Sequence, residues 1–157
     1  AFSMVRSPHG LMFICIDPRW PEDILLALQE NQLSMPAGEG IGAVVFADAL
    51  AGTLPGLTHL YIFTDSTPVV AAVNSGNSDS PQLNMIACWL FERHPQLQLL
   101  AIHQPGKRNN AADGLSRAAS ARVKQDAVDA GAVIWQIDCA HAMHTLARKA
   151  MSMPQRS

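Results

Sequence analysis

The sequence has too few cysteines, and too widely spaced, for a fold held by disulfides. Its 157 residues include only Cys15, Cys88 and Cys139, an odd number with long separations. Small secreted proteins with disulfide frameworks carry paired cysteines at short spacings. The three cysteines therefore predict buried, free thiols and a reducing compartment.

Long apolar runs are also missing. No stretch reaches the roughly 18 apolar residues that a membrane span needs. The N-terminus has no charged segment followed by a long apolar one, as a secretory leader would have. We therefore expect an intracellular protein, cytoplasmic or nuclear, without a membrane partner.

A strong positive charge is absent as well. Lys and Arg number 11 against 13 Asp and Glu, which gives a formal net charge of −2. Phosphate contacts supply most non-specific affinity for nucleic acid, so the total charge does not favour that partner. Between Arg93 and Lys124, however, the basic residues Lys107, Arg108, Arg117 and Arg122 are opposed only by Asp113. This span predicts either a local basic surface or a solvated loop and helix face.

The length and the 48% apolar content fit one α/β domain with a sizeable core. Two short apolar runs, Ala1–Val5 and Leu11–Ile16, flank a turn cluster and predict two strands. A third run, Ile24–Leu28, is expected to complete an antiparallel meander. Ser34 and Pro36 then start a helix, expected from Ala37 to Leu50.

The second half of the domain alternates strands and helices. His59–Asp65 reads as a buried central strand that ends in a carboxylate. Helices are expected at Pro68–Asn74 and Pro81–Arg93, followed by a last strand at Leu97–Ile102. Residues 119–157 are expected to form a C-terminal helical extension, partly disordered, beyond a domain at 1–118.

The segment His103–Arg117, HQPGKRNNAADGLSR, carries the strongest chemical signal. Pro105 and Gly106 indicate a loop, and Asn109 is a good cap for a following Ala-rich helix. A histidine on such a loop can lie near a carboxylate on the helix. Pairs of this kind serve metal-assisted phosphodiester hydrolysis, in which the carboxylate holds a cation and the imidazole moves protons.

This segment resembles the end of the RNase H domain attached to retrotransposon reverse transcriptases. The typical pattern is His-x-Pro-Gly-x-x-Asn-x-x-Ala-Asp-x-Leu-Ser-Arg, and every fixed position of it is met here. The matching residues are His103, Pro105, Gly106, Asn109, Ala112, Asp113, Leu115, Ser116 and Arg117.

The resemblance implies an RNase H-like fold. That fold is a mixed five-stranded sheet, a three-strand antiparallel meander plus two parallel strands, with helices on both faces. The predicted order of three strands, helix, strand, helices, strand and helix is similar to it.

The resemblance also implies a site that holds two Mg²⁺ or Mn²⁺ ions roughly 4 Å apart. Glu39 matches the first-helix ligand, Asp65 the central-strand ligand and Asp113 the last-helix ligand, while His103 assists proton transfer or product release. Taken alone, Asp65 could instead be a helix N-cap, and Glu39 or Asp113 a first-turn acid. Lys107, Arg108, Asn109 and Arg117 are the expected nucleic-acid contacts.

The first-strand aspartate of the family has no counterpart. Ser7-Pro8-His9-Gly10 matches the residues that follow it in the family, which places Val5 at its position. Asp17 is a tempting substitute, but too few residues separate it from Glu39 for two further strands. Asp17 is also expected at the opposite end of the sheet from the first-strand position, since neighbouring strands there run antiparallel.

The resemblance therefore implies hydrolysis of the RNA strand of RNA–DNA hybrids, with one of four acids missing. Two interpretations follow. The chain is either a working variant, in which another acid or the substrate compensates, or a catalytically inactive hybrid-binding or interaction module. Reverse transcriptase and integrase parts of the same polyprotein are the implied protein partners.

Overall fold

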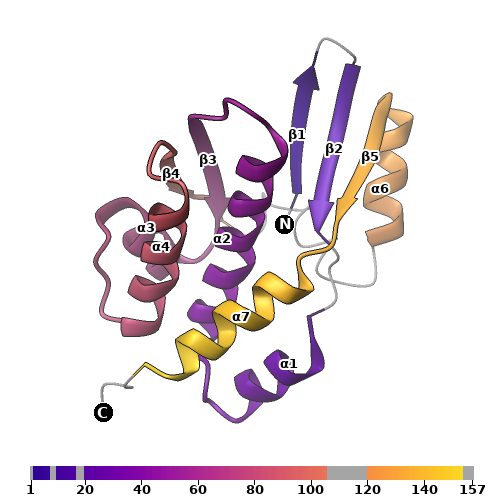
Figure 1. Cartoon of the computed structure of the whole chain (residues 1–157). Coiled ribbons are helices and arrows are strands. Elements are labelled where there is room, and N and C mark those ends of the chain that lie inside the picture. Colours follow the sequence, from indigo (N-terminus) through magenta and orange to yellow (C-terminus); the bar gives the residue numbers. More distant parts are fainter. Residues whose placement is uncertain (1, 8–9, 17–19, 106–119, 154–157) are drawn as a thin grey trace.

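The computed structural model describes residues 2–7, 10–16, 20–105 and 120–153. Over these residues the chain is a mixed α/β protein with two small sheets and several helices (Figure 1). The class agrees with the prediction, and the arrangement of the strands differs from it.

The first sheet holds β1 (Phe2–Ser7), β2 (Gly10–Ile16) and β5 (Ala132–Ile137) in the order β1-β2-β5. β1 and β2 are antiparallel, as predicted, and Gly10 at the start of β2 has a φ of +122° that favours glycine. β5 lies parallel to β2 and was not predicted.

The predicted third strand at Ile24–Leu28 is wrong, because these residues belong to the helix α1 (Glu22–Gln29). Glu22 and Asp23 lie in its first turn, where acids interact favourably with the helix dipole. Its buried residues, Ile24 and Ala27, are three positions apart, as on one face of a helix. The expected three-strand antiparallel meander is therefore not formed.

The helix α2 (Met35–Thr53) contains the predicted helix and lies at the centre of the core. Ser34 caps it by accepting a hydrogen bond from the Ala37 N–H at 3.3 Å. Gly40 allows α2 to approach its neighbour α4 (Pro81–Arg93), since a Cβ there would lie 2.7 Å from Leu83 Cδ2. Close packing thus explains a glycine that lowers helix propensity.

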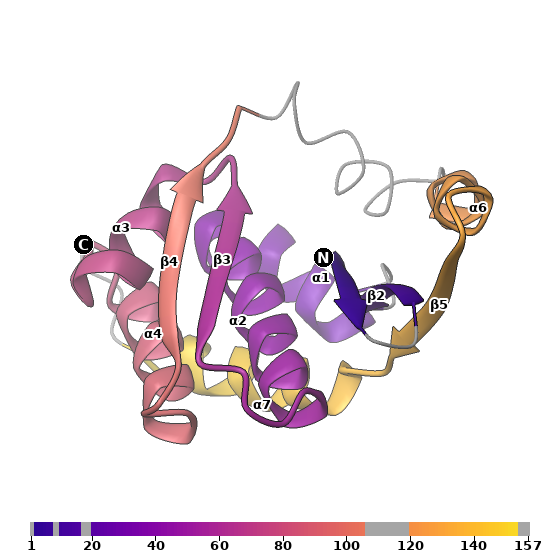
Figure 2. The same cartoon turned by 90° about the horizontal axis from the view of Figure 1, so that it is seen from above.

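The second sheet consists of two parallel strands, β3 (His59–Thr64) and β4 (Gln98–His103). The helix α3 (Thr67–Ser75) follows β3, and α3 and α4 both agree with the prediction. β3 is not the fully buried strand expected from its apolar sequence. Its residues alternate between exposed and partly buried, because α2, α3 and α4 lie on one side of the strands (Figure 2).

The last part of the described chain holds α6 (Ser120–Asp129), β5 and α7 (Ala140–Met151). The predicted helical extension therefore also contains a strand. α7 packs against α2 and α4, and its Leu146, Ala147 and Ala150 are buried in the same core cluster as α2. These C-terminal residues contribute to the main core.

The two sheets lie on either side of α2 in Figure 2 and are not joined by strand pairing. The expected five-stranded sheet is thus not present among the described strands. All three cysteines are free, as predicted; Cys15 and Cys139 are buried, whereas the prediction for Cys88 is wrong because it is exposed. Within the described ranges, no helix has the length and apolar character that crossing a membrane requires.

Candidate functional site

Asp65 and His103 lie at the same edge of the β3–β4 sheet. β3 and β4 are parallel and in register, with Thr64 opposite His103, so their carboxyl ends meet at one edge. The Gln104 N–H donates to the Thr64 carbonyl at 2.8 Å and extends the pairing past both strand ends. Asp65 follows Thr64 directly, and both Asp65 and His103 are exposed. In α/β sheets this edge is where ligands commonly bind.

Asp65 lies between the end of β3 and the N-cap residue of α3. Ser66, not Asp65, occupies the N-cap position of α3, so the alternative reading of Asp65 as a helix cap is wrong. The Ser66 N–H donates to Thr64 Oγ1 at 3.1 Å, and its carbonyl accepts from the Val70 N–H at 3.1 Å. These bonds fix the backbone on the C-terminal side of Asp65.

Glu39 lies on the neighbouring helix α2. It is exposed and is the fifth residue of α2, so it is not the first-turn acid of the alternative interpretation. A Cβ on the adjacent Gly40 would lie 3.8 Å from Val69 Cγ2 in the first turn of α3. This part of α2 therefore lies beside the start of the helix that Asp65 precedes.

The described residues alone do not fit a two-metal centre. Within the ranges that the structure describes, no group of three or more His, Cys, Asp and Glu residues could hold a metal ion. The exposed carboxylates of Glu39 and Asp65 have the oxygen chemistry that Mg²⁺ prefers. They are two of the three ligands that the sequence predicts, and their role stays a prediction.

The other predicted site residues lie outside the described ranges. These are Asp113, Lys107, Arg108, Asn109 and Arg117, together with the alternative acid Asp17. Their predicted roles stay predictions. Val5 lies in β1 opposite Met12 of β2, and β1 does not pair with β3. The position expected for the first-strand ligand is thus in a different sheet from Asp65.

A second polar cluster, which the sequence did not predict, joins α2 to the end of α4. Asp48 Oδ1 accepts from Arg93 Nε at 2.8 Å and lies 2.7 Å from His94 Nε2. The Arg93 guanidinium also lies 4.8 Å from the centre of the Trp89 ring. Asp48 is far from Arg93 and His94 in the sequence, so neither spacing nor composition indicated the cluster.

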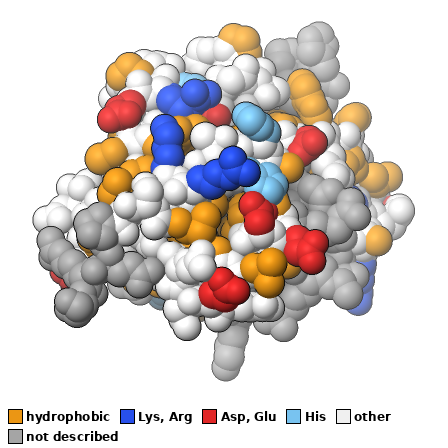
Figure 3. Space-filling model, turned by 60° about the horizontal axis from the view of Figure 1, so that its bottom comes forward, with side chains coloured by type: hydrophobic (Ala, Val, Ile, Leu, Met, Phe, Trp, Pro, Cys, Tyr) orange, Lys and Arg blue, Asp and Glu red, His pale blue; other side chains and the backbone are white. Residues whose placement is uncertain are grey.

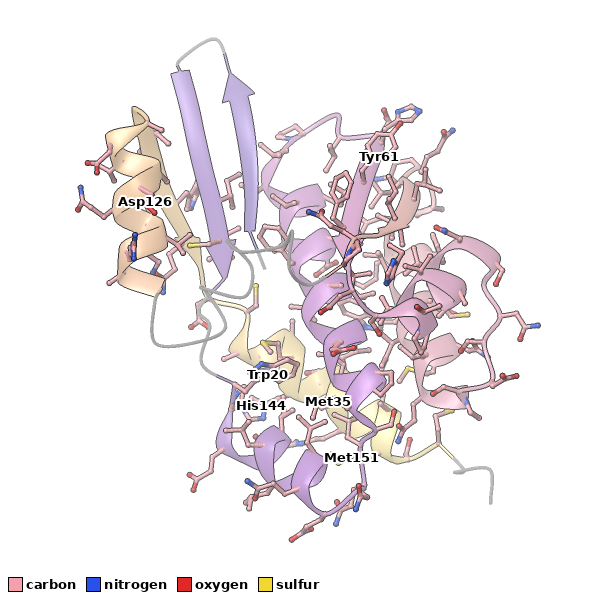
Figure 4. The ribbon with its side chains drawn as sticks, turned by 180° about the vertical axis from the view of Figure 1, so that it is seen from behind. Trp20, Met35, Tyr61, Asp126, His144 and Met151 are labelled. Carbon is pink, nitrogen blue, oxygen red and sulfur yellow. The ribbon has the colours of Figure 1, made fainter. Side chains whose placement is uncertain are left out.

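A further hydrogen-bonded contact joins α1 to α7. His144 Nδ1 lies 2.7 Å from Asp23 Oδ2, near Trp20 in Figure 4. The face seen from below mixes Lys and Arg with His and acidic side chains (Figure 3). Such a surface has no single sign of charge that would attract nucleic acid. The Asp48 and Asp23 contacts connect helices and include neither Asp65 nor His103.

Comparisons with known proteins give no family for this arrangement: no protein-family model, curated protein or solved structure matches the chain.

Proposed function

We propose that the chain is an RNase H-type domain of a retroelement reverse transcriptase that hydrolyses the RNA strand of RNA–DNA hybrids. The observation that carries the proposal is the register of β3 and β4, with Thr64 opposite His103. Two residues assigned to the site from separate motifs, Asp65 and His103, thereby share one sheet edge.

On this proposal Glu39, Asp65 and Asp113 would hold Mg²⁺ or Mn²⁺, and the metal would supply charge stabilisation at the scissile phosphate. His103, exposed at the end of β4, moves a proton or assists product release. Lys107, Arg108, Asn109 and Arg117 contact the hybrid. The exposure of both Asp65 and His103 fits a site that must accept a large substrate.

The family proposal also implies a continuous sheet. If β1 added to the edge of β3 that does not face β4, the order β5-β2-β1-β3-β4 would give five strands. Strand addition would pair the backbone groups on that edge of β3, where no described strand lies in the two-stranded sheet. It would also bring Val5 into the same sheet as Asp65.

A second function has its own support. Val5 has no side-chain atom that could bind a cation. The valine at the first-strand position favours a catalytically inactive module that binds hybrids or a partner through the same fold. Reverse transcriptase and integrase parts of one polyprotein are the proposed protein partners in either case.

A hybrid-cleavage assay with Mg²⁺ and with Mn²⁺ separates the two functions. We expect cleavage by the full chain and a loss of at least about a hundredfold in Asp65→Asn, the order of loss seen when one charge-stabilising group is removed. Asp79→Asn is the matched control, because Asp79 is also an exposed aspartate just before a helix. It should cleave like the original chain.

Hybrid binding is measured on the same proteins by fluorescence anisotropy. Binding of the hybrid without cleavage at every metal concentration would reject the enzyme and support the inactive binding module. Equal loss of cleavage in Asp65→Asn and Asp79→Asn would show that Asp65 has no specific role in cleavage.

A further inference from the structure

The outward face of β3 and β4 exposes two aromatic rings in a row. Tyr61 is 59% exposed and Phe63 is 55% exposed, two positions apart on β3. Opposite them on β4 lie Leu100, which pairs with Tyr61 and is 46% exposed, and Ile102, which pairs with Phe63. We call these four residues the β3–β4 platform.

The opposite face of the same strands is packed. Leu60, Ile62, Leu99 and Ala101 contact the core clusters built on α2, α3 and α4. Figure 2 shows these helices behind both strands, and Figure 4 labels Tyr61 on β3. The platform therefore rests on a packed face, and no described helix or strand covers it in these views.

By itself the platform is much smaller than a stable interface with a second copy of the chain. A stable protein interface buries about 800 Å² on each partner and uses roughly 20 residues a side. The platform offers three large apolar side chains above 40% exposure. A ligand of a few planar groups matches this area better than a protein surface does.

The spacing of the platform favours nucleobases. Residues two apart on a strand are about 6.6 Å apart, wider than the roughly 3.4 Å rise within a stacked duplex strand. Tyr61 and Phe63 can therefore each stack one base of an extended strand, but not two neighbours of a duplex. β3 and β4 themselves contain no Asp or Glu, and the nearest carboxylate along β3 is that of Asp65 at its end.

The platform is also continuous with the proposed site. Phe63 is followed by Thr64 and Asp65, and Ile102 by His103, so the aromatic row runs toward the candidate catalytic edge. A strand lying along β3 would reach Asp65 within a few residues. A nucleic-acid strand bound on the platform would therefore point toward the residues proposed to act on the hybrid.

We propose that the β3–β4 platform binds a short single-stranded segment of nucleic acid by stacking one base on Tyr61 and one on Phe63. The choice of nucleic acid as ligand rests on the proposed function. The segment is the unpaired continuation of a hybrid, held in line with Asp65 and His103.

The test measures binding of the full chain to a short single-stranded RNA, a DNA of the same sequence and a blunt RNA–DNA hybrid, in EDTA. We expect Tyr61→Ala and Phe63→Ala each to raise the single-strand Kd by about tenfold, the usual effect of removing one stacked ring. Tyr61→Phe should keep the affinity because it keeps the ring. Trp135→Ala is the matched control, since Trp135 is a 46% exposed aromatic residue on β5.

Crosslinking with RNA that contains 5-bromouridine gives an independent readout, and we expect adducts on Tyr61 or Phe63. An unchanged Kd in both alanine variants, or an equal loss in Trp135→Ala, would overturn the platform. Cleavage of hybrid without ring-dependent binding would reject the platform and leave the proposed function standing. Ring-dependent binding without any cleavage would reject hydrolysis and keep the platform.

Discussion

At the scale of single residues, Cys139 couples the stability of the fold to alkaline pH. Its side chain is buried at the start of α7. Burial raises the pKa of the Cys139 thiol from 9.0 to about 11, and the charges of Asp138 and Asp48 add to the rise. Between these pH values the unfolded chain loses the thiol proton and the folded chain keeps it, so stability falls as pH rises.

We expect the free energy of unfolding to decrease between about pH 9 and about pH 11 by up to about 1.4 kcal/mol per pH unit from this group. Below about pH 9 the Cys139 thiol keeps its proton in both states, so its contribution to the free energy of unfolding does not change with pH. Urea unfolding across this range measures the slope. Cys139→Ala should remove the Cys139 part of the slope, whereas Cys88→Ala, at an exposed thiol, should keep it. Identical slopes in both variants would show that another group titrates.

The residues of the candidate site were predictable to different degrees. Asp65 and His103 could be placed together because each ends a strand, and parallel strands bring their carboxyl ends to one edge. Glu39 could be assigned to a helix, but its place beside α3 depends on the packing of Gly40 against Leu83 and Val69. Asp48 and His94 could not be paired, because their contact depends on how α2 and α4 pack.

At the scale of elements, Asn74 on α3 pairs with the outer edge of β4. Its Nδ2 donates to the Ala101 carbonyl at 2.8 Å, and its Oδ1 accepts from the Ala101 N–H at 2.7 Å. The side-chain amide thus takes the place of a neighbouring strand at this residue. An open strand edge invites pairing with other chains, and this contact occupies part of it.

Asn74→Ala should lower the free energy of unfolding by about 1–3 kcal/mol, because two backbone groups lose their partner. It should also speed hydrogen exchange of the Ala101 amide, which amide exchange mass spectrometry can follow. Asn77→Ala is the control, since Asn77 bonds to Ser75 Oγ through its backbone carbonyl and N–H, which the substitution keeps. A similar loss of unfolding free energy in both variants would show that the pairing of the Asn74 amide with Ala101 does not stabilise the fold.

Elements with strong start signals were predicted well. Ser34 and Pro36 begin α2, and Ser80 begins α4 by accepting from the Leu83 N–H at 3.3 Å. α1 was mistaken for a strand because a five-residue apolar run does not distinguish the two periods. β5 was missed because its pairing with β2 joins segments more than a hundred residues apart, which local pattern does not report.

At the scale of the whole molecule, α7 makes the C-terminal residues part of one core. Leu146 is fully buried, and the cluster around it includes residues of α2, α4 and α1. Ile14 of β2 belongs to the same cluster, so the first sheet is connected to it as well. An independent extension would contribute little to the stability of the rest of the chain.

Leu146→Ala should therefore destabilise the whole chain by about 2–5 kcal/mol, the usual cost of truncating a fully buried leucine. Unfolding should stay a single transition, followed by helical circular dichroism and by tryptophan fluorescence. Trp20 and Trp89 pack against the main core cluster and Trp135 lies on β5, so the tryptophans sample both sides of α2. Leu25→Ala, at a leucine 43% exposed on α1, is the matched control and should cost far less. Two separate transitions, or equal costs for the two variants, would instead make residues 119–157 an extension that folds apart from the domain.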